Sequence, residues 1–249
     1  MSLERHRADW EQLAEYDALW AVLTDVEKRG GRWEPEEFFA TGEQEIAAVL
    51  DATAALGRPR ERRTALDFGC GAGRLTRALA ARFERAVGVD IASAMVETAR
   101  RLNAAVANAE FRVNDADHLR QFDDGAFDLV YTSLVLQHVP DRALIEGYLR
   151  ELVRVTAPGG VLVAAIPDRI GWPYRLAVRR RVYGLLRRLG VPERTLLERT
   201  PLTPMRMTAV PEARVRAVVA EAGGSVLRAD AEHAGGVRTV RYVVAPVER

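Results

Sequence analysis

The chain has 249 residues, of which 48% are hydrophobic and 29% charged, and its formal net charge at pH 7 is +1. These values fit one large α/β domain, or a domain with an insertion, and the near-zero charge argues against a nucleic-acid partner. Cys70 is the only cysteine, so no internal disulfide can form and a reducing, cytoplasmic setting is expected. The opening MSLERHRADW lacks the apolar core of a signal peptide, and no apolar run is long enough to span a membrane.

The first elements predict a helical lid over residues 1–57. Apolar residues at helical spacing indicate a helix over 8–27, which Gly30 and Gly31 interrupt. A short aromatic stretch over 33–39 then leads to a second predicted helix over 43–56, closed by Gly57.

Alternating strand and helix patterns follow and predict a core domain over 58–166. Strands are expected at 64–68, 86–90, 110–113, 127–132 and 160–166, with helices at 74–83, 93–107 and 141–156. Strands that alternate with helices indicate a parallel sheet with right-handed crossovers.

Residues 167–209 break this alternation and are interpreted as an inserted cap. The segment holds five prolines and one helical pattern, over 175–189. Residues 210–249 resume the core with a helix over 211–222 and strands at 225–231 and 237–245. Gly235 and Gly236 between these two strands indicate an antiparallel hairpin at the sheet edge.

The stretch ALDFGCGAGRLTRAL, residues 65–79, places a glycine-rich loop between the first strand and the first core helix. The P-loop string G-x-x-x-x-G-K-[ST] is absent, and the dinucleotide fingerprint fails because Arg74 stands where a third glycine is needed. The pattern present is D-x-G-x-G-x-G. Asp67 at the mouth of this loop would repel a pyrophosphate and would suit a ligand with an ammonium group.

Two further acids follow later strands. Asp90 ends the second strand, where a carboxylate can accept hydrogen bonds from both ribose hydroxyls, and Ile91 beside it offers an apolar face to a base. Asp115 follows the third strand, where it can accept from an exocyclic adenine amine. A ligand with an amine, a ribose diol and an adenine, but no phosphate, is S-adenosylmethionine.

These motifs, with FDLVYTSLVLQHVPD and LVRVTAPGGVLV, resemble the class I S-adenosylmethionine-dependent methyltransferases, most closely the small-molecule type. The resemblance implies a Rossmann-like, mostly parallel seven-stranded sheet with an antiparallel last strand. It also implies a set of cofactor-binding residues: Asp67, Gly69, Gly71, Gly73, Asp90, Ile91, Met95, Asp115, Ala116, Ser133, Trp33, Phe39, Thr41 and Gly42. Gly69 and Gly71 would approach the methionine part, Asp90 the ribose, and Asp115 and Ala116 the adenine.

His138 follows the fourth strand and is the candidate general base, since its neutral imidazole can take a proton from an acceptor hydroxyl or amine. The alternative is a histidine that caps the helix beginning near Asp141. His6 and His118 are expected on the surface, and His233 is a weaker candidate for the acceptor site.

The resemblance implies transfer of a methyl group to an O, N or C nucleophile of a small molecule, with S-adenosylhomocysteine as product. No metal is expected, since 132–134 lacks the acid of catechol-type relatives. Residues 169–199 carry nine arginines against two glutamates, which a solvated helix face, an anionic acceptor, an acidic partner or a membrane surface would each explain. The alternatives are an RNA or protein methyltransferase that uses this Arg-rich cap, and an enzyme that uses the cofactor without methylating. The oligomeric state, monomer or homodimer, stays open.

Overall fold

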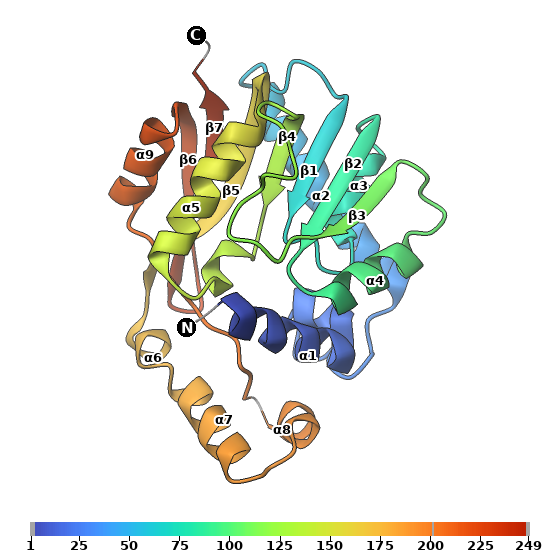
Figure 1. The fold of residues 1–249 in the computed structure, drawn as a ribbon, viewed down its shortest axis with the longest axis vertical. Coiled ribbons are helices and arrows are strands. Elements are labelled where there is room, and N and C mark those ends of the chain that lie inside the picture. The colour runs from blue at the N-terminus through green and yellow to red at the C-terminus, as the bar shows by residue number, and fades with distance from the viewer. Residues whose placement is uncertain (1–2, 201, 248–249) are drawn as a thin grey trace.

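The computed structural model describes residues 3–200 and 202–247. In this part of the chain, seven strands form one sheet in the order β3-β2-β1-β4-β5-β7-β6 (Figure 1). The strands are β1 Thr64–Phe68, β2 Arg85–Asp90, β3 Ala109–Val113, β4 Phe127–Thr132, β5 Thr156–Ile170, β6 Gly224–Ala234 and β7 Val237–Pro246. β7 pairs antiparallel with both of its neighbours, and the other pairings are parallel. The predicted fold class, including the antiparallel last strand and the edge hairpin, is confirmed.

Helices cover both faces of the sheet. The helices outside the cap are α1 Leu3–Val22, α2 Pro35–Ala54, α3 Arg74–Ala80, α4 Ser93–Leu102, α5 Arg142–Val155 and α9 Glu212–Glu221. Leu66 and Val130 face one core with α5 and α9, whereas their neighbours Ala65 and Leu129 face the other core with α2 and α3. This alternation along each strand gives the molecule two apolar layers.

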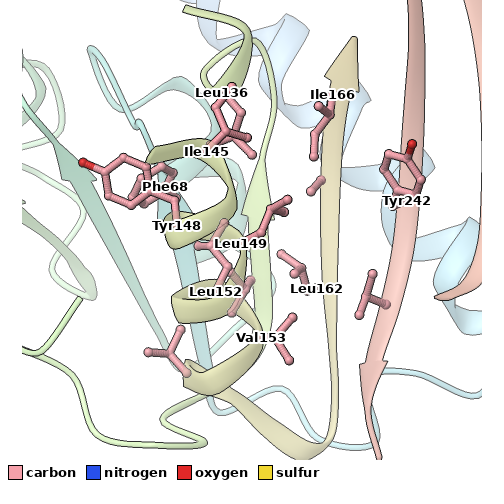
Figure 2. Close-up of a cluster of buried hydrophobic side chains, with 14 of the residues drawn as sticks. Phe68, Leu136, Ile145, Tyr148, Leu149, Leu152, Val153, Leu162, Ile166 and Tyr242 are labelled. Atoms are coloured by element: carbon pink, nitrogen blue, oxygen red, sulfur yellow. The ribbon is translucent and has the colours of Figure 1, made fainter. Parts of the chain in front are cut away.

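The core between α5 and the sheet is the larger of the two. Ile145, Leu149 and Leu152 point from α5 onto β4 and β5, and Tyr148 contacts the Phe68 ring with centroids 4.9 Å apart (Figure 2). Phe68 is the last residue of β1, so this packing fixes the point at which the glycine-rich loop leaves the sheet.

The second helix begins earlier than the sequence predicts. Pro35 occupies its first turn together with Glu36 and Glu37, an arrangement that favours a helix N-terminus. Phe38, Phe39 and Gly42 are therefore helical rather than part of a connection, whereas Trp33 precedes the helix. A glycine in a sequence often marks the end of a helix, but Gly42 lies inside α2. Its lack of a side chain lets α2 approach α3 closely.

The first helix is also shifted, to Leu3–Val22 instead of 8–27. Asp17 interrupts it with extended backbone angles, and its carboxylate accepts from the backbone N–H groups of Trp20, Gly30 and Gly31 at 2.8–3.1 Å. One side chain thus ties the loop after α1 back onto the helix.

Residues 167–209, interpreted from the sequence as an inserted cap, contain three short helices in their described part: α6 Trp172–Leu176, α7 Val178–Arg188 and α8 Glu193–Arg199. β5 continues to Ile170, four residues further than predicted, because those residues pair with β7. Tyr183, Leu196 and Leu197 of the cap are buried against Leu13 of α1. Figure 1 shows α7 and α8 on the far side of α1 from the sheet.

Within the described residues, no helix is both long enough and apolar enough to cross a bilayer.

Replacing Gly42 by alanine should destabilise the protein. The added Cβ would lie 2.5 Å from the backbone oxygen of Arg74 and 2.8 Å from its Cγ, so α2 and α3 would have to separate. Overpacking of this kind costs about 1–3 kcal/mol. Chemical denaturation should show this loss of unfolding free energy.

Gly147→Ala is the matched control. Gly147 lies inside α5, and apart from its chain neighbours and the nearby backbone of that helix no described atom stands within 4 Å of the position that an alanine methyl would take there. This change should raise stability by up to about 1 kcal/mol, as helix propensity predicts. Equal effects of the two substitutions would contradict the proposed close contact at Gly42.

Candidate functional site

A cavity of about 1610 Å³ lies beyond the carboxyl ends of β1, β2, β3 and β4. Gly69, Asp90, Asn114 and Ser133, which end or follow these four strands, all contribute to its wall. The carboxyl edge of a parallel sheet is the usual place for a ligand in this architecture. The end of α1, the loop after it and the cap segment close the other sides.

The glycine-rich loop is held by the end of β2. The N–H groups of Gly69 and Cys70 both donate to the Val89 carbonyl, at 2.8 and 2.9 Å. Gly69, Gly71 and Gly73 have φ values of 79°, 51° and 84°, which only glycine adopts easily. A Cβ on Gly69 would lie 2.3 Å from the Val135 side chain, so the glycine-rich loop also packs tightly against the segment that follows β4.

Asp90 joins this loop to the next helix. Its Oδ2 accepts from the Gly71 N–H and its Oδ1 from the Ala92 N–H, each at 2.9 Å. Burial raises the pKa of the carboxyl to about 6, although these backbone donors oppose the shift. Each carboxylate oxygen has a second lone pair, and the residue lines the cavity beside Ile91 and Met95.

Eight of the fifteen residues predicted from the sequence line the cavity: Trp33, Gly69, Gly71, Asp90, Ile91, Met95, Ser133 and His138. The other seven lie outside its lining: Phe39, Thr41, Gly42, Asp67, Gly73, Asp115 and Ala116.

Asp67 lies beneath the loop rather than at its mouth. The Thr76 hydroxyl donates to its Oδ2 at 2.6 Å, and burial raises the pKa of this carboxyl to about 7. Gly73 sits one position before α3. Thr41 and Gly42 pack against Arg74, and Phe39 lies under the guanidinium of Arg77.

At the end of β3 the neighbouring residue, Asn114, faces the cavity instead of Asp115. Asp115 is exposed and forms a 3.4 Å ion pair with Arg7, whereas Asn114 is buried and its N–H donates to the Asp90 carbonyl. The Ala116 carbonyl accepts from the Tyr148 hydroxyl at 2.9 Å. Successive side chains leave a strand in opposite directions, so a shift of one residue decides which one points inward.

Sequence reasoning missed a buried polar network beside the loop. Arg74 donates to Glu45 at 2.7 Å, and the Tyr131 hydroxyl donates to the other Glu45 oxygen at 2.7 Å. Burial favours the neutral form of Glu45, but Arg74 and Tyr131 outweigh it and lower the pKa of this carboxyl. Arg74 lines the cavity, and its Nε has no hydrogen-bond partner among the described residues.

His138 is held in one tautomer. Its Nδ1 donates to the Arg206 carbonyl at 2.7 Å, since a carbonyl can only accept, and its Nε2 lies 3.1 Å from the Gln137 amide nitrogen. Burial lowers the pKa of the imidazole, so the ring is neutral at pH 7 with its lone pair on Nε2. The helix-capping alternative is wrong, because Asp141 accepts from the Leu144 N–H and caps α5.

His6 is not on the surface as expected. It is only 8% exposed and lines the cavity near Trp10, whose ring also contacts His138 with centroids 5.4 Å apart. Burial, and then the charges of His138 and Arg206, lower its pKa to about 4. The earlier start of α1 brings His6 onto the helix face that packs inward.

The described lining carries more positive than negative charge. It includes the six arginines Arg29, Arg74, Arg179, Arg180, Arg181 and Arg206, but only Asp25 and Asp90 as acids. With His6 and His138 neutral, the cavity keeps a net positive potential. In the same described part of the chain, no three His, Cys, Asp or Glu side chains gather as a metal-ligand group.

Comparison with known proteins agrees with this geometry. Residues 66–164 match the family described as the methyltransferase domain. The core of this chain is thus similar to a methyltransferase domain. The family resemblance inferred from the sequence motifs is therefore confirmed over the range that holds the glycine-rich loop, Asp90 and His138.

Curated relatives of this chain include trans-aconitate 2-methyltransferase from Methylobacterium radiotolerans, 38% identical over 53% of this chain and 48% of that protein. Another is 2-methyl-6-phytyl-1,4-hydroquinone methyltransferase from Synechocystis, 40% identical over 41% of this chain and 31% of that protein. The chain thus spans a third to a half of the length of these relatives.

Among solved structures, the magnesium protoporphyrin IX methyltransferase of Synechocystis with bound SAH covers 98% of this chain and 100% of its own, with a TM-score of 0.63 and 19% identity. A methyltransferase of Leishmania major has a TM-score of 0.65 at 14% identity, covering 97% of this chain and 82% of its own. Likeness at this identity establishes the fold, which extends beyond residues 66–164 to nearly the whole chain.

Proposed function

We propose that the protein transfers a methyl group from S-adenosylmethionine to a nucleophilic O, N or C atom of a small molecule, leaving S-adenosylhomocysteine. The observation that carries this proposal is Asp90. Its carboxylate stands at the end of β2, is bonded to the glycine-rich loop and lines the cavity beyond the sheet.

The residues present fit such a cofactor. Asp90 has lone pairs for two ribose hydroxyls, Ile91 and Met95 offer apolar surface to the adenine, and Asn114 rather than Asp115 is placed for polar contact with it. Arg74, with an unpartnered buried Nε, is suited to the cofactor carboxylate. When bound, S-adenosylmethionine supplies an electrophilic methyl group on its sulfonium.

The chain's own residues then act mainly by positioning. Methyl transfer is an in-line displacement, and fixing two reactants in attack geometry can supply roughly 7–11 kcal/mol. The lid residues around Trp33 and the cap residues around Tyr174 and Met205 close the cavity and can exclude water from it. His138, neutral and with Nε2 as its basic atom, is proposed to take the proton of an acceptor hydroxyl or amine.

The charge of the cavity favours an acceptor that carries a negative group. Arg206 lines the cavity, its Nε has no hydrogen-bond partner, and it forms no ion pair within the described residues. Three of the relatives are named for trans-aconitate, a carboxylate.

The single cysteine, Cys70, is buried and fits the proposed reducing, cytoplasmic setting.

Calorimetry should detect saturable binding of S-adenosylmethionine and S-adenosylhomocysteine, and none of NAD. Asp90→Ala should weaken this binding by about 1.5–3 kcal/mol, the value of hydrogen bonds to a charged group. The exposed Asp115→Ala is the matched comparison and should bind almost as the wild type does. Binding should also weaken below about pH 6, where Asp90 gains a proton, and this dependence should vanish with Asp90→Ala. Tight binding of NAD instead would overturn the proposal.

His138→Ala should lower kcat by about 10²–10⁴ for an acceptor that must lose a proton, with cofactor affinity nearly unchanged. Because the imidazole pKa is lowered from 6.5, the wild-type rate should hold down to below that pH and then fall as the ring protonates. The variant should lack this acidic limb. Turnover within a few-fold of wild type would make His138 structural, and would point to an acceptor that is already nucleophilic, such as a carboxylate.

Arg206→Gln should raise the KM of acidic acceptors by about 10–100-fold, as loss of a charge-assisted hydrogen bond predicts, and leave the KM of neutral acceptors unchanged. The acidic acceptors tested are carboxylates such as trans-aconitate, and the comparison acceptors are hydroquinones and amines. Assays with methyl-labelled cofactor measure the KM of each acceptor for the wild type and the variant. Arg82→Gln, an exposed arginine outside the cavity, is the control. An equal loss for neutral and acidic acceptors would contradict the role given to Arg206.

A further inference from the structure

The outer face of the cap gathers exposed apolar side chains. Of thirteen large hydrophobic residues exposed in the described chain, seven lie between positions 172 and 189: Trp172, Tyr174, Leu176, Val178, Val182, Leu185 and Leu189. Trp172 and Leu189 are each 71% exposed. A concentration of this kind in one short segment marks an interaction surface rather than the scattered apolar exposure of an ordinary surface.

The exposed apolar residues of α7 lie on one side of the helix, separate from the side that packs against the rest of the protein. Val178, Val182, Leu185 and Leu189 follow one another at intervals of four, three and four residues, which places them in one stripe along the helix. A different side of α7, carrying Tyr183 and Leu186, packs against the buried cluster of α1. One side of α7 therefore packs against α1, and a second apolar stripe on the helix is exposed to solvent.

Arginines flank this outward stripe. At 100° per residue, Arg181 and Arg188 fall on the free side of the stripe, and Arg179, in the first turn, falls on the side of Leu186; all three are exposed. Residues 169–192 contain seven arginines and no aspartate or glutamate. Long basic side chains beside an exposed apolar stripe are typical of a helix that lies in the plane of an anionic bilayer surface.

We propose that α6 and α7 form a docking surface for an anionic lipid bilayer, with the apolar stripe at the acyl boundary and the flanking arginines among the headgroups. Charge decides against a second copy of the chain on this face, because two-fold pairing would place the same arginines against one another. Figure 1 shows the segment projecting from the body of the molecule, where a flat surface can reach it.

The docking surface adjoins the mouth of the cavity. Trp172, Tyr174 and Val178 are exposed and also line the cavity. Given the proposed methyl transfer, a lipid-dissolved acceptor carrying an acidic headgroup could pass from the bilayer into the cavity without crossing water. The docking itself does not depend on the reaction.

Vesicle flotation with the full chain tests the docking without any cofactor. The protein should float with vesicles of phosphatidylcholine and phosphatidylglycerol, remain behind with phosphatidylcholine alone, and dissociate at high salt. A triple variant, Leu185→Glu, Arg188→Glu and Leu189→Glu, changes no residue of the cavity lining. Each basic residue at an anionic surface contributes roughly fivefold in affinity, so this variant should bind at least about tenfold more weakly.

The matched control is Leu56→Glu, Arg82→Glu and Leu227→Glu, which makes the same charge change at exposed positions outside the cap. The control should float as the wild type does. No flotation of the wild type with anionic vesicles at low salt, or equal flotation of the two triple variants, would overturn the docking surface. Sedimentation showing a wild-type dimer that only the cap variant dissolves would assign the face to a second copy instead. S-adenosylhomocysteine binding, measured in parallel, reports on the proposed function separately.

Discussion

The contact between the end of β2 and the glycine-rich loop determines the rest of the site. The Val89 carbonyl and the Asp90 carboxylate together accept from three consecutive N–H groups, those of Gly69, Cys70 and Gly71. A loop that adopts three positive φ values is intrinsically loose, and these bonds hold it in one conformation. The position of the loop in turn sets the first turn of α3, the approach of α2 to Arg74, and the floor of the cavity.

This arrangement carries an electrostatic cost in the free protein. Asp67 and Asp90 have an ordinary pKa of 3.8, and burial raises these values to about 7 and about 6. Between pH 3.8 and those values the folded state holds more protons than the unfolded state, so both groups make the free energy of unfolding fall as pH rises through that window. His6 acts in the opposite direction between its folded pKa of about 4 and its ordinary 6.5. A ligand that donates hydrogen bonds to Asp90 offsets part of the cost, so stabilisation by ligand should be greater at neutral than at acidic pH.

The sequence predicted the sheet and its edge hairpin because strand and helix patterns repeat there with clear turn residues between them. Asp90 was predicted to face the ligand because it is the acid that ends the second strand, and a carboxylate there can accept hydrogen bonds from ribose hydroxyls. Asn114, by contrast, differs from Asp115 by one position, and only the direction in which each side chain leaves β3 separates them. Arg206, Trp10 and His6 reach the cavity through tertiary packing of the lid and the cap, and no local pattern marks such contacts. Thr41 and Gly42 lie outside the cavity lining for a related reason, since both belong to α2 and pack against Arg74, a contact between helices that no local pattern marks.

The start of α7 breaks a local rule of helix electrostatics. Its first turn carries Arg179, Arg180 and Arg181 with no acidic residue, although the N-terminus of a helix already bears a partial positive charge. The left-handed backbone of Ala177, with φ 47°, ends α6 and places this positive turn beside the cavity. Residues that follow one another on a helix point about 100° apart, so three consecutive arginines spread charge around the helix rather than onto one side. The charge of Asp9 in α1 offsets part of this repulsion at Arg180, and an anion at the cavity mouth or along the outer face would offset more of it. The charge pattern therefore links the acidic group proposed for the acceptor to the anionic surface proposed for the cap, because the same turn of helix borders both.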